Sequence, residues 1–153
     1  MTVLSAGFEK ASEVVRHEHQ ALTSELNELE ACLNALVCYS EVYADLAPME
    51  RVYRCGRHLR STLPEHFRNE EATVLADVEA AMPQLRPFVH QMRRQHGDLQ
   101  GSLNQFCRLL TGIEETPDLE QTICEIKERG LSFAKAMLAH MCGVVSRIAQ
   151  LPS

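Results

Sequence analysis

Several signals that would place this chain in a familiar class are missing from its sequence. The 153 residues include no tryptophan and only eight aromatic residues, five Phe and three Tyr. No apolar run approaches the roughly 20 residues of a membrane span, and the first ten residues do not resemble an export signal. We therefore expect a cytoplasmic protein without membrane contact.

The six cysteines are not spaced for the common metal or redox motifs. None of them forms a C-x-x-C pair, which argues against a zinc knuckle and against a thioredoxin-like site. Reduced thiols are the default in a chain without an export signal. We interpret most of these cysteines as small residues of the core or its boundary.

Basic residues are fewer than acidic ones. The chain has 15 Lys and Arg against 21 Asp and Glu, and its formal net charge is −6. This balance argues against a nucleic-acid partner, which needs a positive surface. One basic row does occur, and we interpret it as a solvated helix face; it consists of Arg51, Arg54, Arg57 and Arg60.

Apolar residues recur every three or four positions along most of the chain, which is the period of an amphipathic helix. The pattern predicts helices at roughly 7–38, 48–80, 86–111 and 118–150. Short loops separate them, and no strand pattern or internal repeat is visible. We therefore expect an all-α protein, an antiparallel up-down-up-down four-helix bundle that forms a single domain over 1–153. The apolar stripes should face the bundle axis.

Each of the four stripes contains one histidine, and the other three histidines fall off the stripes. In an antiparallel hairpin, two residues at the same height lie symmetrically about the loop. The pair 19 and 66 and the pair 66 and 96 are both centred on a predicted loop. The pair 96 and 140 is centred on residue 118, at the end of a loop, so the fourth histidine should align less well. The four histidines are His19, His66, His96 and His140.

Histidines that converge in an apolar interior need polar partners, because burying a polar group without one costs about 2–7 kcal/mol. Imidazole is the commonest metal ligand in proteins and suits iron, copper and zinc. Glu70 lies one helical turn after His66, on the same face. Pro64 either bends this helix beside the site or is a tolerated irregularity. The sequence therefore predicts a metal site whose ligands are His19, His66, Glu70, His96 and His140.

The segments around these residues resemble the hemerythrin-like family of HHE cation-binding domains. The similar segments are "EHQAL" with His19, "HFRNEEATVL" with His66 and Glu70, "RQHGDL" with His96, and "LAHM" with His140. The "HFRNEEATVL" segment is the most specific match. The resemblance implies a four-helix bundle with a non-heme diiron centre that binds oxygen or a related small molecule.

The chain also departs from the pattern of that family. Members usually have a carboxylate four or five residues after the fourth-helix histidine, where this chain has Val144 and Val145. Some have a second histidine four residues before the third-helix one, where this chain has Met92. Because the next layer is mostly apolar, we expect fewer than two tightly bound irons per chain, either one ion or a heme.

Three functions remain open at this point. The first is a non-heme iron site, mononuclear or dinuclear, that binds or senses a diatomic ligand such as O2 or NO. The second is a heme between the helices with two core histidines as axial ligands; close approach of such a group, or tight helix packing, would explain Gly97, Gly101 and Gly143. The third is a metal-free interaction module. No catalytic group is recognisable, so we expect binding rather than catalysis, and the sequence does not indicate an oligomeric state.

Overall fold

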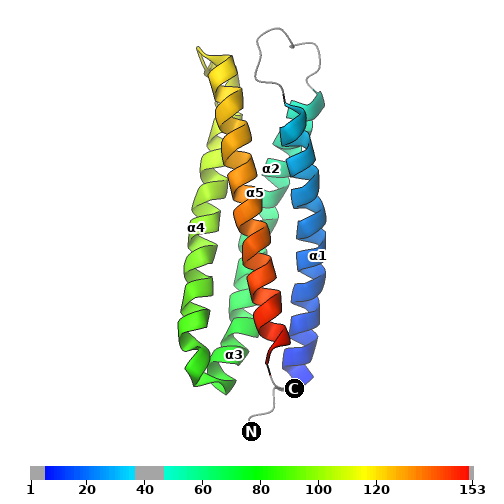
Figure 1. The fold of residues 1–153 in the computed structure, drawn as a ribbon, viewed down its shortest axis with the longest axis vertical. Helices are drawn as coiled ribbons and strands as arrows, with labels where there is room; N and C mark the ends of the chain where they lie inside the picture. The colour runs from blue at the N-terminus through cyan, green and yellow to red at the C-terminus, as the bar shows by residue number, and fades with distance from the viewer. Residues whose placement is uncertain (1–5, 37–46, 152–153) are drawn as a thin grey trace.

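The computed structural model describes residues 6–36 and 47–151. This part of the chain forms four long helical rods that lie side by side. Figure 1 shows that α1 and α4 run in one direction while α2 and α5 run in the other, so that the start of α1 and the end of α5 lie at the same end. α1 packs against α2 and α5, and α4 packs against the same two helices. The up-down-up-down bundle is therefore confirmed. The four helices are α1 (Ala6–Ala35), α2 (Ala47–Glu70), α4 (Arg86–Thr111) and α5 (Leu119–Ala149).

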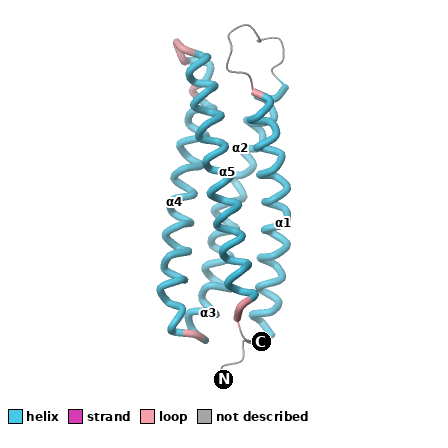
Figure 2. Tube along the Cα trace, in the orientation of Figure 1, coloured by secondary structure: helices cyan, strands magenta, loops and turns pink. Residues whose placement is uncertain are grey.

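The second rod is a composite of three helical segments. α2 continues into a π-helical turn, η1 (Glu71–Leu75), and then into the short α3 (Ala76–Ala81). The 3₁₀ turns η2 (Pro83–Leu85) and η3 (Ile113–Glu115) precede α4 and α5. Figure 2 shows helix along nearly the whole trace and no strand in the part that the structure describes.

The predicted helix bounds agree with the structure to within three residues where they can be compared. The helix predicted at 86–111 has those bounds, and the last helix is one residue shorter at each end than predicted. Residues 37 and 38, the predicted end of the first helix, lie outside the described residues. The sequence pattern did not reveal the π-helical turn inside the second helix.

A polar layer divides the core into two apolar clusters. On every helix, the buried apolar residues toward one end belong to a larger cluster and those toward the other end to a smaller one, and the predicted histidine lies at or within one residue of the change. The larger cluster includes Leu26, Leu59, Leu103, Phe106 and Phe133. The smaller cluster includes Val15, Val74, Leu75, Val89, Met92 and Val144. The apolar layer expected beside the histidines is therefore present, with Val144 fully buried.

Two glycines allow the helices to approach closely, and they are not the ones that the sequence suggested. A Cβ atom added to Gly130 would lie 2.6 Å from the Leu33 side chain, and one added to Gly56 would lie 2.9 Å from that of Leu110. A Cβ added at Gly97, Gly101 or Gly143 would meet nothing within 4 Å. Tight packing between helices therefore does not explain those three glycines.

The described cysteines divide by position as expected for core and boundary residues. Cys32, Cys55 and Cys107 are buried, whereas Cys124 and Cys142 are exposed. Burial, followed by the nearby carboxylate of Glu28, raises the pKa of the Cys55 thiol to about 11. Such a thiol stays protonated and inert.

None of the described helices is both long enough and apolar enough to cross a membrane.

Candidate metal centre

The four predicted histidines converge on the carboxylate of Glu70, which is fully buried. The Nε2 atoms of His19 and His66 lie 3.0 and 3.2 Å from its Oε2 atom. The other oxygen, Oε1, faces the remaining two histidines. Its distances to Nε2 are 3.0 Å for His96 and 3.7 Å for His140.

Glu70 thus lies between two groups of potential ligands. His19 and His66 form one group with Oε2, and His96 and His140 form the other with Oε1. Within each group the potential ligand atoms all lie within 4.8 Å of one another. The Nε2 atoms of His96 and His140 are 3.1 Å apart, so the fourth histidine reaches the same level as the third, more closely than its sequence position predicted.

Three of the four imidazoles also have a polar partner on their outer nitrogen. The Nδ1–H of His66 donates to Glu18, and that of His96 donates to Glu71 at 3.1 Å. The Nδ1–H of His140 donates to Oε1 of Gln95 at 2.7 Å. Such outer partners fix the tautomer and the ring orientation, and they leave Nε2 directed inward.

The outer partners were not predicted, although all three of them, Glu18, Glu71 and Gln95, are neighbours of predicted ligands in the sequence. Glu18 precedes His19 on α1 but contacts the histidine of α2. Glu71 follows Glu70 and opens the π-helical turn η1. Irregular turns of this kind are frequent at functional sites. Here the turn begins where two consecutive glutamates both contact histidines, Glu70 inside the layer and Glu71 at its edge.

Pro64 does not interrupt the helix that carries the site. α2 is α-helical on both sides of Pro64, and the irregular turn begins seven residues later, at Glu71. Pro64 is thus accommodated within one continuous helix.

Phe67 is a second feature that the sequence pattern missed. Its ring stacks on the imidazole of His96, with the centroids 4.1 Å apart and an interplanar angle of 13°. It also contacts His66 and His140, at centroid distances of 5.7 and 5.9 Å. Phe67 therefore forms an apolar wall on the side of the larger cluster, to which it belongs.

The three histidines that fall off the stripes lie away from the centre. The side chains of His17, His58 and His90 are 56–63% exposed, and each lies within 4 Å of a surface glutamate. The stripe pattern therefore separated the inward histidines from the outward ones correctly.

The family model of the hemerythrin HHE cation-binding domain matches residues 10–144. The chain belongs to this family. No curated protein and no solved structure matches the chain. The HHE domain assignment agrees with a buried group of histidines and a carboxylate, and it implies a cation-binding function.

The electrostatics of this HHE domain also suit a cation. Burial by itself raises the pKa of Glu70, but the surrounding imidazoles reverse the effect and hold it well below the usual range. Burial lowers the pKa of His66, but its contacts with Glu70 and Glu18 outweigh burial and raise it. Burial lowers the pKa of His140, and the contact with Glu70 does not reverse this. The centre therefore contains an ionised carboxylate surrounded by nitrogen donors.

The hydrogen bonding of the centre is incomplete in a way that a cation would satisfy. Nε2 of His66 is buried and makes no hydrogen bond, although it lies within ion-pair distance of Glu70. Buried polar atoms without partners are rare in folded proteins. Imidazole nitrogen together with carboxylate oxygen is a donor set that suits first-row transition metals. The residues of the centre therefore fit a metal ion.

A heme does not fit this arrangement. The Nε2 atoms of His96 and His140 are 3.1 Å apart, and all four imidazoles surround a single carboxylate. Two axial histidines would have to stand on opposite faces of a porphyrin, which would have to displace Glu70 and Phe67 from between the helices.

Proposed function

We propose that the chain binds iron in the bundle core, on either side of Glu70, and presents it to a diatomic ligand such as O2 or NO. His19 and His66 would hold one ion together with Oε2 of Glu70. His96 and His140 would hold a second ion together with Oε1. The observation that carries the proposal is this division of four imidazoles between the two oxygens of one buried carboxylate.

The two positions should fill unequally. Two divalent cations that share a single carboxylate repel each other more strongly than in a site with two bridging acids. Glu18 and Glu71 add negative charge next to the histidines, but neither lies among the inner ligand atoms. We therefore propose one tightly bound ion and a second, weaker one.

The surrounding residues would control how the diatomic molecule reaches the iron and how the histidine ligands are oriented. Each side of Glu70 offers three protein donors, so a bound iron would keep open positions for a diatomic ligand. The apolar residues on both sides of the layer, including Phe67 and Val144, form its two walls. The outer acceptors Glu18, Glu71 and Gln95 keep the protons of their histidines on Nδ1. This arrangement favours reversible binding, as in a carrier or a sensor.

The proposal is tested by adding ferrous iron to the metal-free protein without oxygen and then exposing it to NO or O2. We expect iron to remain bound after desalting and the visible spectrum to change with each gas. The comparison sample is His66→Ala/His96→Ala, which loses one ligand from each side of Glu70. A wild-type chain that retains no more iron than this variant would refute the proposal.

A further inference from the structure

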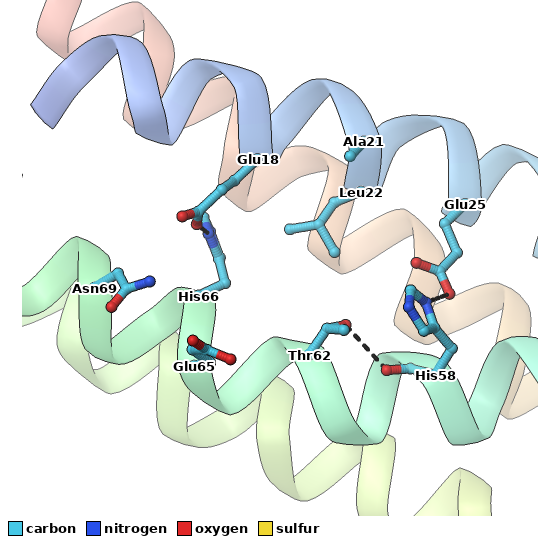
Figure 3. A pocket seen from close by; sticks show the side chains of 9 residues that line it. All are labelled: Glu18, Ala21, Leu22, Glu25, His58, Thr62, Glu65, His66 and Asn69. Carbon is cyan, nitrogen blue, oxygen red and sulfur yellow. Dashed lines mark hydrogen bonds and ion pairs between the residues drawn. The ribbon is translucent and has the colours of Figure 1, made fainter. Parts of the chain in front are cut away.

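A groove of about 250 Å³ lies between α1 and α2, beside the metal centre. Figure 3 shows the nine side chains that line it. They include no Lys or Arg, but three are carboxylates and two are imidazoles: Glu18, Glu25, Glu65, His58 and His66. The groove is therefore negatively charged and rich in metal-binding groups.

The inner end of the groove is formed by a member of the centre. His66 lines the groove although the residue is only 4% exposed. On the groove side its Nδ1–H donates to Glu18, whose side chain is 28% exposed. On the inner side its Nε2 is directed at Glu70 and has no hydrogen bond. A single buried imidazole thus separates the acidic groove from the central carboxylate.

The outer end of the groove has a second imidazole–carboxylate pair. Nδ1–H of His58 donates to Oε1 of Glu25 at 2.5 Å. The His58 side chain is 61% exposed and that of Glu25 is 16% exposed, so this pair is accessible from solvent. Figure 3 shows the two pairs one behind the other along the groove, with Thr62 between their helical positions.

Two further grooves reach histidines of the centre, and their charges differ. The groove between α4 and α5 reaches His140 and contains one carboxylate, Asp98. The groove between α1 and α5 reaches His19 and contains Arg16 but no carboxylate. A cation approaching the buried centre would therefore be attracted most strongly to the α1–α2 groove.

We propose that the α1–α2 groove is the entry route of the divalent cation, which Glu25, His58 and Glu65 bind transiently before it reaches His66 and Glu70. The inference rests on the proposed function, because it needs a cation-binding centre at the inner end. The groove residues raise the local cation concentration and so act on the rate of loading. They are not ligands of the final site and do not set its occupancy.

The test is a stopped-flow measurement of Co(II) uptake by the metal-free protein at low ionic strength, followed by visible absorbance. Glu25→Gln/Glu65→Gln removes two charges from the groove and leaves every residue of the centre in place. We expect uptake to slow about tenfold or more, since electrostatic focusing raises on-rates by 10–10³. The final amount of bound cobalt should equal that of the wild type. Added salt should slow the wild type more than the variant.

The matched control is Asp98→Asn/Glu128→Gln, which removes the same charge from other grooves of the bundle. Its uptake rate should stay close to that of the wild type. Equal slowing in both double variants would overturn the entry route and indicate a general effect of net charge. An unchanged rate, or a lower final occupancy, in the groove variant would overturn it too. A wild type that binds no cobalt at equilibrium would overturn the proposed function as well, whereas the other outcomes leave that function intact.

Discussion

At the scale of single residues, burial separates the histidines of the centre from the rest. His19, His66, His96 and His140 are at most 5% exposed, and each points its Nε2 at Glu70. Their apolar surroundings make each imidazole costly to bury without a partner. The ionised carboxylate of Glu70 is a shared polar partner for several of these imidazoles. The same contacts offset the free-energy cost of burying the carboxylate.

The first prediction concerns the inward and outward histidines. His66→Ala or His96→Ala should lower the iron retained per chain at equilibrium by several-fold or more, because each removes one of only three donors on its side of Glu70. The measurement is iron content after desalting. His17→Ala and His90→Ala are the matched controls, since both side chains are more than half exposed. Similar losses in all four variants would show that iron binds elsewhere.

The convergence of the four histidines and Glu70 could be predicted from the sequence, and the outer partners of the histidines could not. Helical periodicity alone places His66 and Glu70 on one face. Glu18 and Glu71 occupy positions beside the stripes that resemble those of ordinary surface glutamates. Their roles depend on contacts across to another helix, such as that of Glu18 with His66. The spacing of residues within one helix contains no information about such contacts.

At the scale of the elements, the distance between neighbouring helices depends on particular glycines. The periodic pattern of apolar residues does not distinguish these glycines from others in the chain. The predicted helix ranges were close to those observed, because long apolar stripes with Pro or Gly near their ends mark helices well. The π-helical turn η1 was missed, since the stripe continues through it at Val74. The tight helix contacts were also assigned to the wrong glycines. Which glycine faces a neighbouring helix depends on packing between helices.

The second prediction tests these glycines as a matched pair on α5. Gly130→Ala should destabilise the protein by about 1–3 kcal/mol, because its methyl group overlaps the side chains of Leu33 and Phe106. Gly143→Ala should be neutral, or stabilise by about 0.4–1 kcal/mol, because its Cβ meets nothing and alanine favours the helix. Urea unfolding of the metal-free proteins measures both. Destabilisation by Gly143→Ala as large as that by Gly130→Ala would contradict the described packing.

At the scale of the whole molecule, the bundle isolates one polar layer between two apolar clusters. The larger cluster provides most of the apolar burial that stabilises the antiparallel bundle. The smaller cluster seals the other side of the layer, and it contains Met92 and Val144, the two positions at which the resemblance to the family implies further ligands. This HHE domain thus has apolar side chains at both of these positions. The number of irons that it holds should depend on this difference.

The last prediction restores a carboxylate to that layer. Val144→Glu places an acid in the fully buried position next to the centre, where it can offset the repulsion between two cations. We expect tightly bound iron to rise from about one to about two per chain. Without metal the same variant should be less stable than the wild type, because a buried carboxyl group then lacks a partner. Iron content after desalting, together with urea unfolding with and without iron, measures both effects.

The neighbouring position supplies the control for this variant. Val145 is 43% exposed, so Val145→Glu adds the same charge to α5 without placing it in the buried layer. Its iron content and its stability should remain close to those of the wild type. If the wild type already binds two irons tightly and Val144→Glu changes nothing, then Glu70 suffices as the bridge. The outer carboxylates Glu18 and Glu71 would then compensate the second charge, and the apolar layer would not limit the number of ions.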